Sequence, residues 1–326
     1  MLVLVIFKAA IAVIPIVEVK QLTKRFGETA VLRGVNLSAE RGTVLGVLGP
    51  NGAGKTTVIN CLTTLLRPDG GTATIAGYDV VRQPEAVRSL IGLTGQFAAV
   101  DEVLTARENL VLFGRLLRLS GKAAKRRTDE LLTQFDLTEA ANRPVKTFSG
   151  GMRRRLDLAA SIVVSPLVLF LDEPTTGLDP RSRQQLWAVV KDLKAQGITI
   201  ILTTQYLEEA DALADQIVVI DQGQVIAEGT VDELKDKVGG KFCELRLANL
   251  EDFAKVKALL ADIGNVITGE MGQAGPIAIA APNGANTLTE IVVRLESAGI
   301  SLADISLRRP SLDDVFFSLT GHTTKD

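Results

Sequence analysis

Apolar positions follow two alternating patterns from residue 16 to about residue 229. Short, nearly continuous apolar runs rich in β-branched residues cover residues 43–49, 167–171, 198–203 and 216–221. Such runs are typical of strands buried on both faces, as in a parallel sheet. Helical patterns separate them, and this alternation predicts an α/β domain with a largely parallel sheet over residues 16–238.

The strand pattern stops between about residues 100 and 165, where the apolar spacing becomes helical. Two apolar stripes predict two helices in this stretch. The first stripe is Leu110, Leu112, Phe113, Leu116, Leu117 and Leu119, and the second is Leu131, Leu132 and Phe135. We expect a helical subdomain inserted into the α/β domain.

The composition changes after Gly239 and Gly240. The patterns then predict strands over residues 242–248, 266–270, 277–281 and 302–307, with helices over residues 251–263 and 287–298. This β-α-β-β-α-β order predicts a small ferredoxin-like α+β domain over residues 239–326, which a short helix over residues 311–319 closes. Because it has no phosphate loop or clustered acids, we expect it to serve dimerisation or regulation.

The first fifteen residues are apolar except for Lys8. A membrane-spanning helix needs about 20 apolar residues, and a central lysine is costly there. No small-residue cleavage site follows, as a secretory signal would require. We interpret residues 1–15 as an N-terminal extension, with a membrane-surface anchor as the alternative. No later apolar segment is long enough to span a bilayer, which predicts a soluble or peripheral protein.

Composition and charge narrow the classes of function. With 46% hydrophobic and 23% charged residues the chain is an ordinary globular protein, and a net charge of −2 gives no general attraction for nucleic acid. The basic clusters at residues 125–127 and 153–155 are local. Cys61 and Cys243 lack the spacing of a zinc site. Because His322 is the only histidine, acid–base chemistry in the middle of the chain must rest on carboxylates, Lys or Tyr.

One stretch fits the phosphate-loop pattern G-x-x-x-x-G-K-[ST], between a strand pattern and a helical one. It reads Gly49-Pro50-Asn51-Gly52-Ala53-Gly54-Lys55-Thr56-Thr57. The glycines let backbone N–H groups face phosphate oxygens, and the helix N-terminus adds partial positive charge. We expect Lys55 to neutralise the β- and γ-phosphates of ATP and Thr56 to bind Mg²⁺. A plain glycine-rich turn is the alternative, and the complete motif in this setting argues against it.

An apolar strand ends in two adjacent acids, Asp172 and Glu173. Ligands gather at this edge of open α/β sheets, and buried carboxylates need a compensating cation, which Mg²⁺ bound to ATP supplies. Because successive strand residues face opposite ways, we expect Asp172 near the metal and Glu173 at the attacking water as general base. The alternative is a helix cap followed by a first-turn glutamate before Pro174.

A second helix start is also suited to phosphate. Ser149, Gly150 and Gly151 open a helical pattern, and serine with glycines at a helix N-terminus can bind an anion or simply cap the helix. One chain thus has one phosphate loop and two phosphate-binding helix ends. The simplest geometry that uses both is a head-to-tail homodimer in which each chain closes over the ATP of the other.

At this point the chain resembles the ATP-binding cassette (ABC) proteins, over residues 16–234. The loop at 49–57 resembles their Walker A motif, 149–153 their signature motif, 168–173 their Walker B strand with its glutamate, and 177–180, with Asp179, their D-loop. Gln96 matches the Q-loop glutamine, which in the family senses the nucleotide with its Mg²⁺ and meets the permease. Phe26 matches the aromatic residue that stacks on adenine. The alternative for Gln96 is a glutamine in a surface turn, and the alternative for Phe26 is an aromatic residue that only belongs to a strand.

One position departs from the family. Gln205 follows the strand at 198–203, where the family usually has a histidine that contacts the γ-phosphate. Glutamine can donate and accept hydrogen bonds but cannot carry a proton at neutral pH. The resemblance therefore implies a slow ATPase that depends more heavily on Glu173.

Gln205, residues 97–101 and residues 309–316 resemble the daunorubicin/doxorubicin-resistance subgroup. The resemblance implies an ATPase subunit that powers export of a drug, antibiotic or lipid-like molecule. Its expected partners are a second copy of the chain and a separate integral-membrane permease, with the subunit peripheral at the cytoplasmic face of the membrane. The alternatives are a soluble ABC-type ATPase acting on DNA or ribosomes, and a nucleotide switch that hardly hydrolyses ATP.

Overall fold

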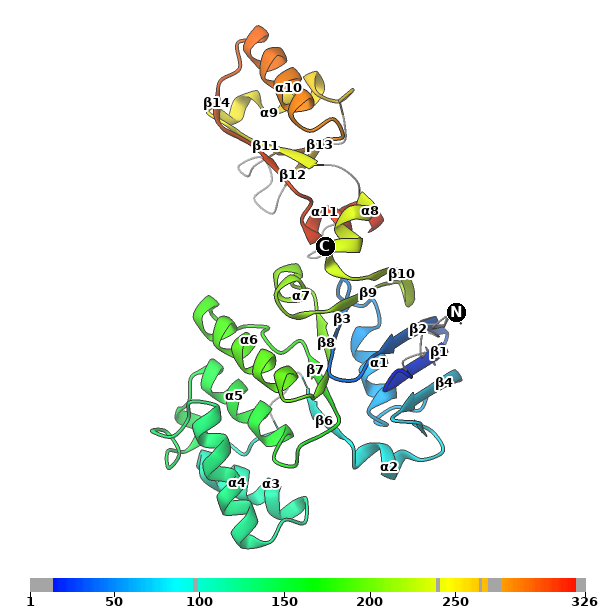
Figure 1. The fold of residues 1–326 in the computed structure, drawn as a ribbon, viewed down its shortest axis with the longest axis vertical. Helices are drawn as coiled ribbons and strands as arrows, with labels where there is room; N and C mark the ends of the chain where they lie inside the picture. Colours follow the sequence, from blue (N-terminus) through cyan, green and yellow to red (C-terminus); the bar gives the residue numbers. More distant parts are fainter. Residues whose placement is uncertain (1–13, 96–98, 239–240, 264–265, 269–276, 321–326) are drawn as a thin grey trace, which may run out of the picture. The chain divides into compact units, whose positions relative to one another are not determined.

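The computed structural model describes residues 14–95, 99–238, 241–263, 266–268 and 277–320. The chain divides into two compact units, Met1–Ile226 and Ala227–Asp326. Figure 1 shows helices on both sides of the main sheet of the first unit and a smaller sheet with helices in the second. Within the described ranges, no helix has both the length and the apolar character needed to cross a membrane. Most of the extension expected over residues 1–15 lies outside these ranges.

Two sheets form the first unit. The larger has six strands in the order β10-β9-β3-β8-β7-β6, and the smaller has four in the order β2-β1-β4-β5. The strands are β1 (Val17–Phe26), β2 (Thr29–Ala39), β3 (Val44–Leu48), β4 (Gly70–Ile75), β5 (Tyr78–Asp79), β6 (Ile91–Thr94), β7 (Val168–Asp172), β8 (Thr199–Thr204), β9 (Gln216–Asp221) and β10 (Gln224–Gly229). β3 is parallel to β8 and β9, and β7 is parallel to β6 and β8. The predicted parallel sheet is confirmed.

Alternate side chains of the central strands enter two hydrophobic cores. The helices of this unit are α1 (Lys55–Leu62), α2 (Pro84–Arg88), α3 (Ala106–Leu116), α4 (Gly121–Gln134), α5 (Gly150–Ser161), α6 (Pro180–Ala195) and α7 (Leu207–Leu213). Val168 and Phe170 of β7 share a core with α1, β1 and β2. Leu169 and Leu171 share the other core with α4, α5 and α6. Helices α1 and α5 therefore cover opposite faces of the six-stranded sheet.

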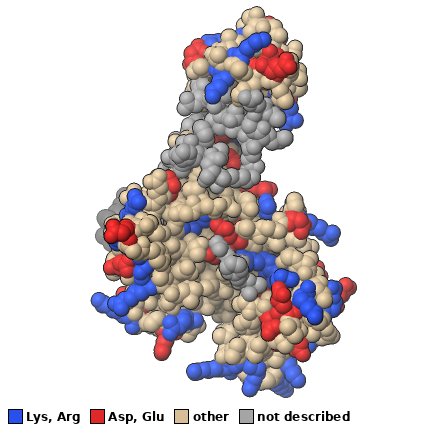
Figure 2. All heavy atoms as spheres, turned by 180° about the vertical axis from the view of Figure 1, so that it is seen from behind, with Lys and Arg blue, Asp and Glu red and all other residues tan. Residues whose placement is uncertain are grey.

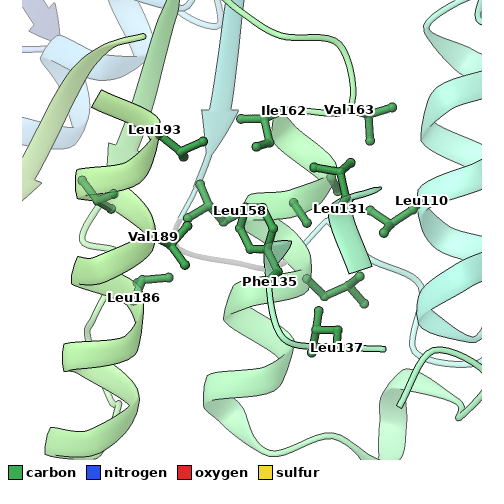
Figure 3. Close-up of a cluster of buried hydrophobic side chains, with 14 of the residues drawn as sticks. Leu110, Leu131, Phe135, Leu137, Leu158, Ile162, Val163, Leu186, Val189 and Leu193 are labelled. Atoms are coloured by element: carbon green, nitrogen blue, oxygen red, sulfur yellow. The ribbon is translucent and has the colours of Figure 1, made fainter. Parts of the chain in front are cut away.

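Helices α3, α4 and α5 lie in the stretch over which we expect a helical subdomain. Thr105 and Glu108 form a reciprocal capping box at the start of α3, and the side chain of Ser120 caps α4. Phe135 follows α4 and is completely buried. Figure 3 shows Phe135 beside Leu158 of α5, in the core that joins the subdomain to the sheet.

The first predicted helical stripe is only partly buried. Leu110 is inaccessible to solvent, but Leu112, Leu116 and Leu117 are 43%, 68% and 49% exposed. Helix α3 buries Ala106, Asn109, Leu110 and Gly114. Leu112 and Leu116 are four residues apart and lie on another face of the helix. The sequence correctly predicts a helix here but overstates its apolar contact with the core.

The second unit has a ferredoxin-like arrangement. Its sheet order is β12-β13-β11-β14, with α9 and α10 packed on one hydrophobic core. Its elements are α8 (Val231–Val238), β11 (Lys241–Leu247), α9 (Phe253–Leu259), β12 (Val266–Thr268), β13 (Ile277–Ala281), α10 (Ala285–Ser297), β14 (Leu302–Arg308) and α11 (Leu312–Thr320). The division between the units falls before the boundary expected at residues 238/239, because α8 packs against α11.

Charged side chains of both signs are mixed on the surface. Lys24 pairs with Asp69 at 2.9 Å, and Arg153 pairs with Glu102 at 3.0 Å. Figure 2 shows Lys and Arg interspersed with Asp and Glu on the face that it presents. Ion pairs in contact with solvent add little to stability, so we attribute the fold mainly to the buried cores.

Candidate active site

The predicted phosphate loop joins the central strand β3 to α1. Gly49 follows β3 immediately, and a Cβ atom there would lie 2.2 Å from the carbonyl oxygen of Ile220. Gly52 and Gly54 have φ angles of +81° and +107°, a region that side chains disfavour. Glycine is therefore required at these positions by steric contact and by backbone conformation. The loop runs directly into the start of α1, where a helix N-terminus can bind phosphate.

The side chain of Lys55 turns back into this loop. Its Nζ donates hydrogen bonds to the carbonyl oxygens of Gly49 at 2.8 Å and Pro50 at 3.0 Å. It also lies 3.5 Å from Oε1 of Glu173, and the side chain is only 4% exposed. Burial lowers the pKa of Lys55, and the nearby carboxylate of Glu173 opposes that shift. The loop thus holds a buried cation, which suits the binding of polyphosphate.

Asp172 ends β7 and is held by two hydroxyl groups. Its carboxylate is almost completely buried. Its Oδ1 accepts hydrogen bonds from Oγ1 of Thr203 at 2.5 Å and Oγ1 of Thr56 at 3.3 Å. Asp172 is two residues after Phe170 on β7, so its side chain points to the same face of the sheet as those of Val168 and Phe170, toward α1. Asp172 and Thr56, which are distant in the sequence, are thereby brought together.

Glu173 interrupts the alternation of the strand. Its φ is +48°, in the left-handed region that costs energy for a residue with a side chain. Its backbone N–H donates to the carbonyl oxygen of Thr203 at 3.1 Å and to the Thr203 hydroxyl at 3.0 Å. A hydrogen bond from Thr176 at 3.3 Å reaches its Oε2. The turned backbone brings Glu173 toward Lys55, so both acids lie at the phosphate loop rather than on opposite faces.

These groups suit a nucleotide with a magnesium ion. In the described part of the chain, no group of three or more His, Cys, Asp or Glu side chains could hold a metal. Mg²⁺, however, usually binds one or two carboxylates or hydroxyls together with substrate phosphates and water. Thr56 and Asp172 form such a donor set beside a loop that only glycine fits. The residues therefore fit Mg²⁺ bound to ATP.

The signature residues begin α5, on the other face of the sheet from α1. Ser149 caps α5 by accepting a hydrogen bond from the N–H of Met152 at 3.2 Å, and Ser149 and Gly150 are exposed. A Cβ on Gly151 would lie 2.4 Å from Oγ of Ser182 in α6. Because α5 and α1 cover opposite faces of the sheet, the helix that Ser149 caps and the helix that follows the Walker A loop are on different sides of the sheet.

The remaining predicted residues lie at the ends of elements. Phe26 ends β1, is 51% exposed and has Nζ of Lys24 5.7 Å from its ring centre. Asp179 caps α6 by accepting the N–H of Ser182 at 2.9 Å. Gln205 directly follows β8 and is partly exposed. Gln96 lies outside the described residues.

Two further residues reach the site without having been singled out for it in the sequence. Thr203 links Asp172 to the backbone of Glu173, and its position at the end of an apolar strand parallel to β7 is a signal that could have identified it. Arg154 belongs to the basic cluster at residues 153–155, which the sequence marks only as charged. Its guanidinium lies among carbonyl groups at the ends of β6 and β7.

Comparisons with known proteins agree with this geometry. Residues 32–176 match the ABC transporter family. The chain is 53% identical to the daunorubicin resistance ATP-binding protein DrrA2 of Streptomyces coeruleorubidus, over 95% of this chain and 96% of that protein. The chain belongs to the ABC transporter ATP-binding proteins. It is an ATPase of this family, and the fold and family expected from the sequence are confirmed.

Other relatives cover the same regions. The doxorubicin resistance ATP-binding protein DrrA of Mycobacterium tuberculosis (strain ATCC 25618 / H37Rv) is 52% identical, over 92% of this chain and 91% of that protein. A dimeric post-hydrolysis structure of an ATP-binding cassette bound to ADP and Pi matches with a TM-score of 0.60 and 27% identity. It covers 66% of this chain and 98% of that one, so the chain extends beyond a complete cassette.

We predict that Thr203→Val lowers ATP hydrolysis and weakens its response to Mg²⁺. The change keeps the volume but removes the hydroxyl that donates to Asp172 and accepts from Glu173. Stability should fall by about 1–3 kcal/mol, the cost of buried groups left without partners. Steady-state hydrolysis over a Mg²⁺ titration and urea unfolding measure the two effects.

Thr199→Val is the matched control. Thr199 is buried at the other end of β8, where its hydroxyl accepts the N–H of Gly42 at 2.9 Å. This variant should lose similar stability and keep its Mg²⁺ response. Equal losses of activity in the two variants would show that Thr203 acts only through stability.

Proposed function

We propose that this chain is the ATP-hydrolysing subunit of an exporter that expels a drug, antibiotic or lipid-like molecule. The observation that carries the proposal is the convergence of Lys55, Thr56, Asp172 and Glu173 at one edge of the sheet. The similarity to two drug-resistance ATP-binding proteins along most of the chain supports an export role. The subunit would work with a separate integral-membrane permease, as a peripheral protein at the cytoplasmic face of the membrane.

Walker A residues would bind and neutralise the substrate ATP. Backbone N–H groups within residues 49–57 would donate hydrogen bonds to the phosphate oxygens, and Lys55 would neutralise the β- and γ-phosphates. Thr56 and Asp172 would hold Mg²⁺, joined by Gln96. When bound, this ion would offset phosphate charge and help to orient the terminal phosphate.

Glu173 would act as the general base for hydrolysis. Its carboxylate lies at the edge of the loop that would hold the γ-phosphate, and the chain offers no mid-chain histidine for the task. It would accept a proton from the attacking water as that water approaches in line with the bond that breaks. Gln205, at the end of β8, would contact the γ-phosphate by hydrogen bonding without carrying a proton.

Two copies of the chain would close head to tail over two ATP molecules. Ser149 and Gly150 are exposed at the start of α5, and α5 is on the other side of the sheet from the helix that follows its own phosphate loop. A partner's loop would bring phosphate to Ser149, Gly150 and Gly151. The dimeric state of the matching cassette structure supports this arrangement. Asp179 would lie near the same junction, and Phe26, half exposed at the end of β1, would stack on adenine.

We expect Glu173→Gln to abolish turnover while ATP still binds. General-base catalysis contributes roughly 10²–10⁴-fold, so hydrolysis should fall by at least about 10²-fold. ATP should then trap a dimer that size-exclusion chromatography detects. Glu208→Gln removes an exposed glutamate on α7 and serves as the control. Unchanged hydrolysis in Glu173→Gln would exclude Glu173 as the base.

Mg²⁺-dependent hydrolysis by the wild type should be slow, and Gln205→His should speed it. Histidine can donate to the γ-phosphate and can also carry a proton near neutral pH. Gln196→His introduces the same residue at the exposed end of α6 and should change nothing. Equal hydrolysis rates in the wild type and Gln205→His would show that Gln205 does not limit ATP hydrolysis.

If the chain powers export, it should bind to membranes that contain its permease. When it is co-expressed with a multi-span permease of the daunorubicin-resistance type, the chain should sediment with membranes. Without the permease it should remain in the supernatant. Sedimentation with ribosomes or DNA instead would favour the soluble ATPase, and absence of any turnover would favour the nucleotide switch.

A further inference from the structure

Arg154 reaches from the signature helix α5 to the ends of two neighbouring strands. Its Nη1 donates to the carbonyl oxygen of Gly95 at 2.6 Å, and its Nε donates to that of Pro174 at 2.8 Å. Its Nη2 lies 3.1 Å from the carbonyl oxygen of Asp172 and 3.3 Å from that of Glu173. Since β6 and β7 are parallel and adjacent, these carbonyls lie at the same edge of the sheet. One guanidinium therefore joins α5 to the backbone of both acids.

Asp157, one turn further along α5, adds a second contact between this helix and the chain that follows β6. Its Oδ1 accepts the N–H of Ala99 at 2.7 Å, and its Oδ2 lies 3.7 Å from Nη1 of Arg154. The side chains of Arg154 and Asp157 are 11% and 4% exposed. Gly95 and Ala99 stand on either side of residues 96–98, so α5 holds the chain at both ends of that segment.

The arrangement opposes the strain at Glu173. A left-handed residue with a side chain persists only where its surroundings fix it. Thr203 holds the N–H of Glu173, and Arg154 holds the carbonyls of Asp172, Glu173 and Pro174. A rigid guanidinium fork can bind several acceptors at once, whereas the ammonium of lysine acts as a point charge. Arg154 thereby contributes to the backbone geometry from which the Glu173 carboxylate projects.

We propose that Arg154 is a positioning residue for ATP hydrolysis. It fixes the position of the turn at Glu173 relative to the signature helix α5. Asp157 orients Arg154 and fixes Ala99. A movement of α5 is then transmitted directly to the backbone of the base and to Gly95. The inference rests on the proposed role of Glu173 as the base.

Steady-state kinetics of Arg154→Met test this role. Misplacing a catalytic group by about 1 Å costs on the order of 10²-fold, so kcat should fall roughly ten- to hundredfold. The KM for ATP should stay close to the wild-type value, because the phosphate loop and Lys55 are untouched. Arg154→Lys, which keeps the charge without the fork, should lose less and provides a second variant if Arg154→Met does not fold.

A second readout does not depend on turnover. Hydrogen exchange of the peptide that contains Ala99 should become faster in Arg154→Met and Asp157→Ala. Asp157→Asn keeps an acceptor for the Ala99 N–H and should exchange more slowly than Asp157→Ala. Wild-type exchange in both Arg154→Met and Asp157→Ala would overturn the proposed contact.

Arg127→Met is the matched control. Arg127 of α4 also donates to backbone carbonyls, those of Ile162 at 3.1 Å and Val163 at 3.2 Å, at the far end of α5. Its loss should lower the thermal midpoint about as much as the loss of Arg154 but leave kcat close to wild type. An equal loss of kcat in both variants, or full kcat in Arg154→Met, would overturn the proposal.

Glu173→Gln separates this inference from the function on which it rests. If Glu173→Gln is inactive and Arg154→Met is fully active, only the positioning role fails. If Glu173→Gln keeps its activity, Glu173 is not the base and the positioning role fails with it.

Discussion

The candidate site depends on how the chain holds the carboxylate of Asp172 where water hardly reaches it. The carboxylate stays there because the hydroxyls of Thr203 and Thr56 donate to it. Both donors follow from the topology: β8 is parallel to β7, with Thr203 beside Asp172, and Thr56 lies in the first turn of α1 after the central strand. The same Thr203 hydroxyl accepts the N–H of Glu173. One side chain therefore links the expected metal ligand to the backbone of the expected base.

Charge balance at this edge involves two buried cations of different kinds. Lys55 binds loop carbonyls and approaches Glu173, and burial lowers its pKa. Phosphate would replace interactions that this ammonium already makes, so the site is arranged for an anion in advance. Arg154 instead binds carbonyls of the backbone that carries the two acids. The lysine is thus placed to bind substrate, and the arginine is placed to maintain the site.

The elements that the sequence predicts well are those fixed by local pattern. The apolar runs predict β3, β7, β8 and β9. The glycines predict the phosphate loop, and Gly49 is needed there because a Cβ atom would collide with the backbone of Ile220. Contacts between distant elements were harder to predict. The partial exposure of α3 depends on what packs beside it, and the turn at Glu173 departs from strand alternation. Arg154 looks like any surface arginine until the ends of β6 and β7 are placed near it.

The two helix ends that we expect to bind phosphate belong to helices on opposite faces of the sheet. Strand alternation sends Phe170 toward α1 and Leu169 toward α5, so α5 cannot reach the phosphate loop of its own chain through the core. Its contact with the site runs around the sheet edge, where Arg154 meets the carbonyls that follow β6 and β7. Gly151 lets the same helix approach Ser182 of α6 more closely than a side chain would permit. The start of α5 is exposed, while Arg154 in its next turn contacts the backbone of Asp172 and Glu173 in the same chain. In the head-to-tail dimer that we propose, α5 would therefore connect the ATP site of its own chain with that of the partner.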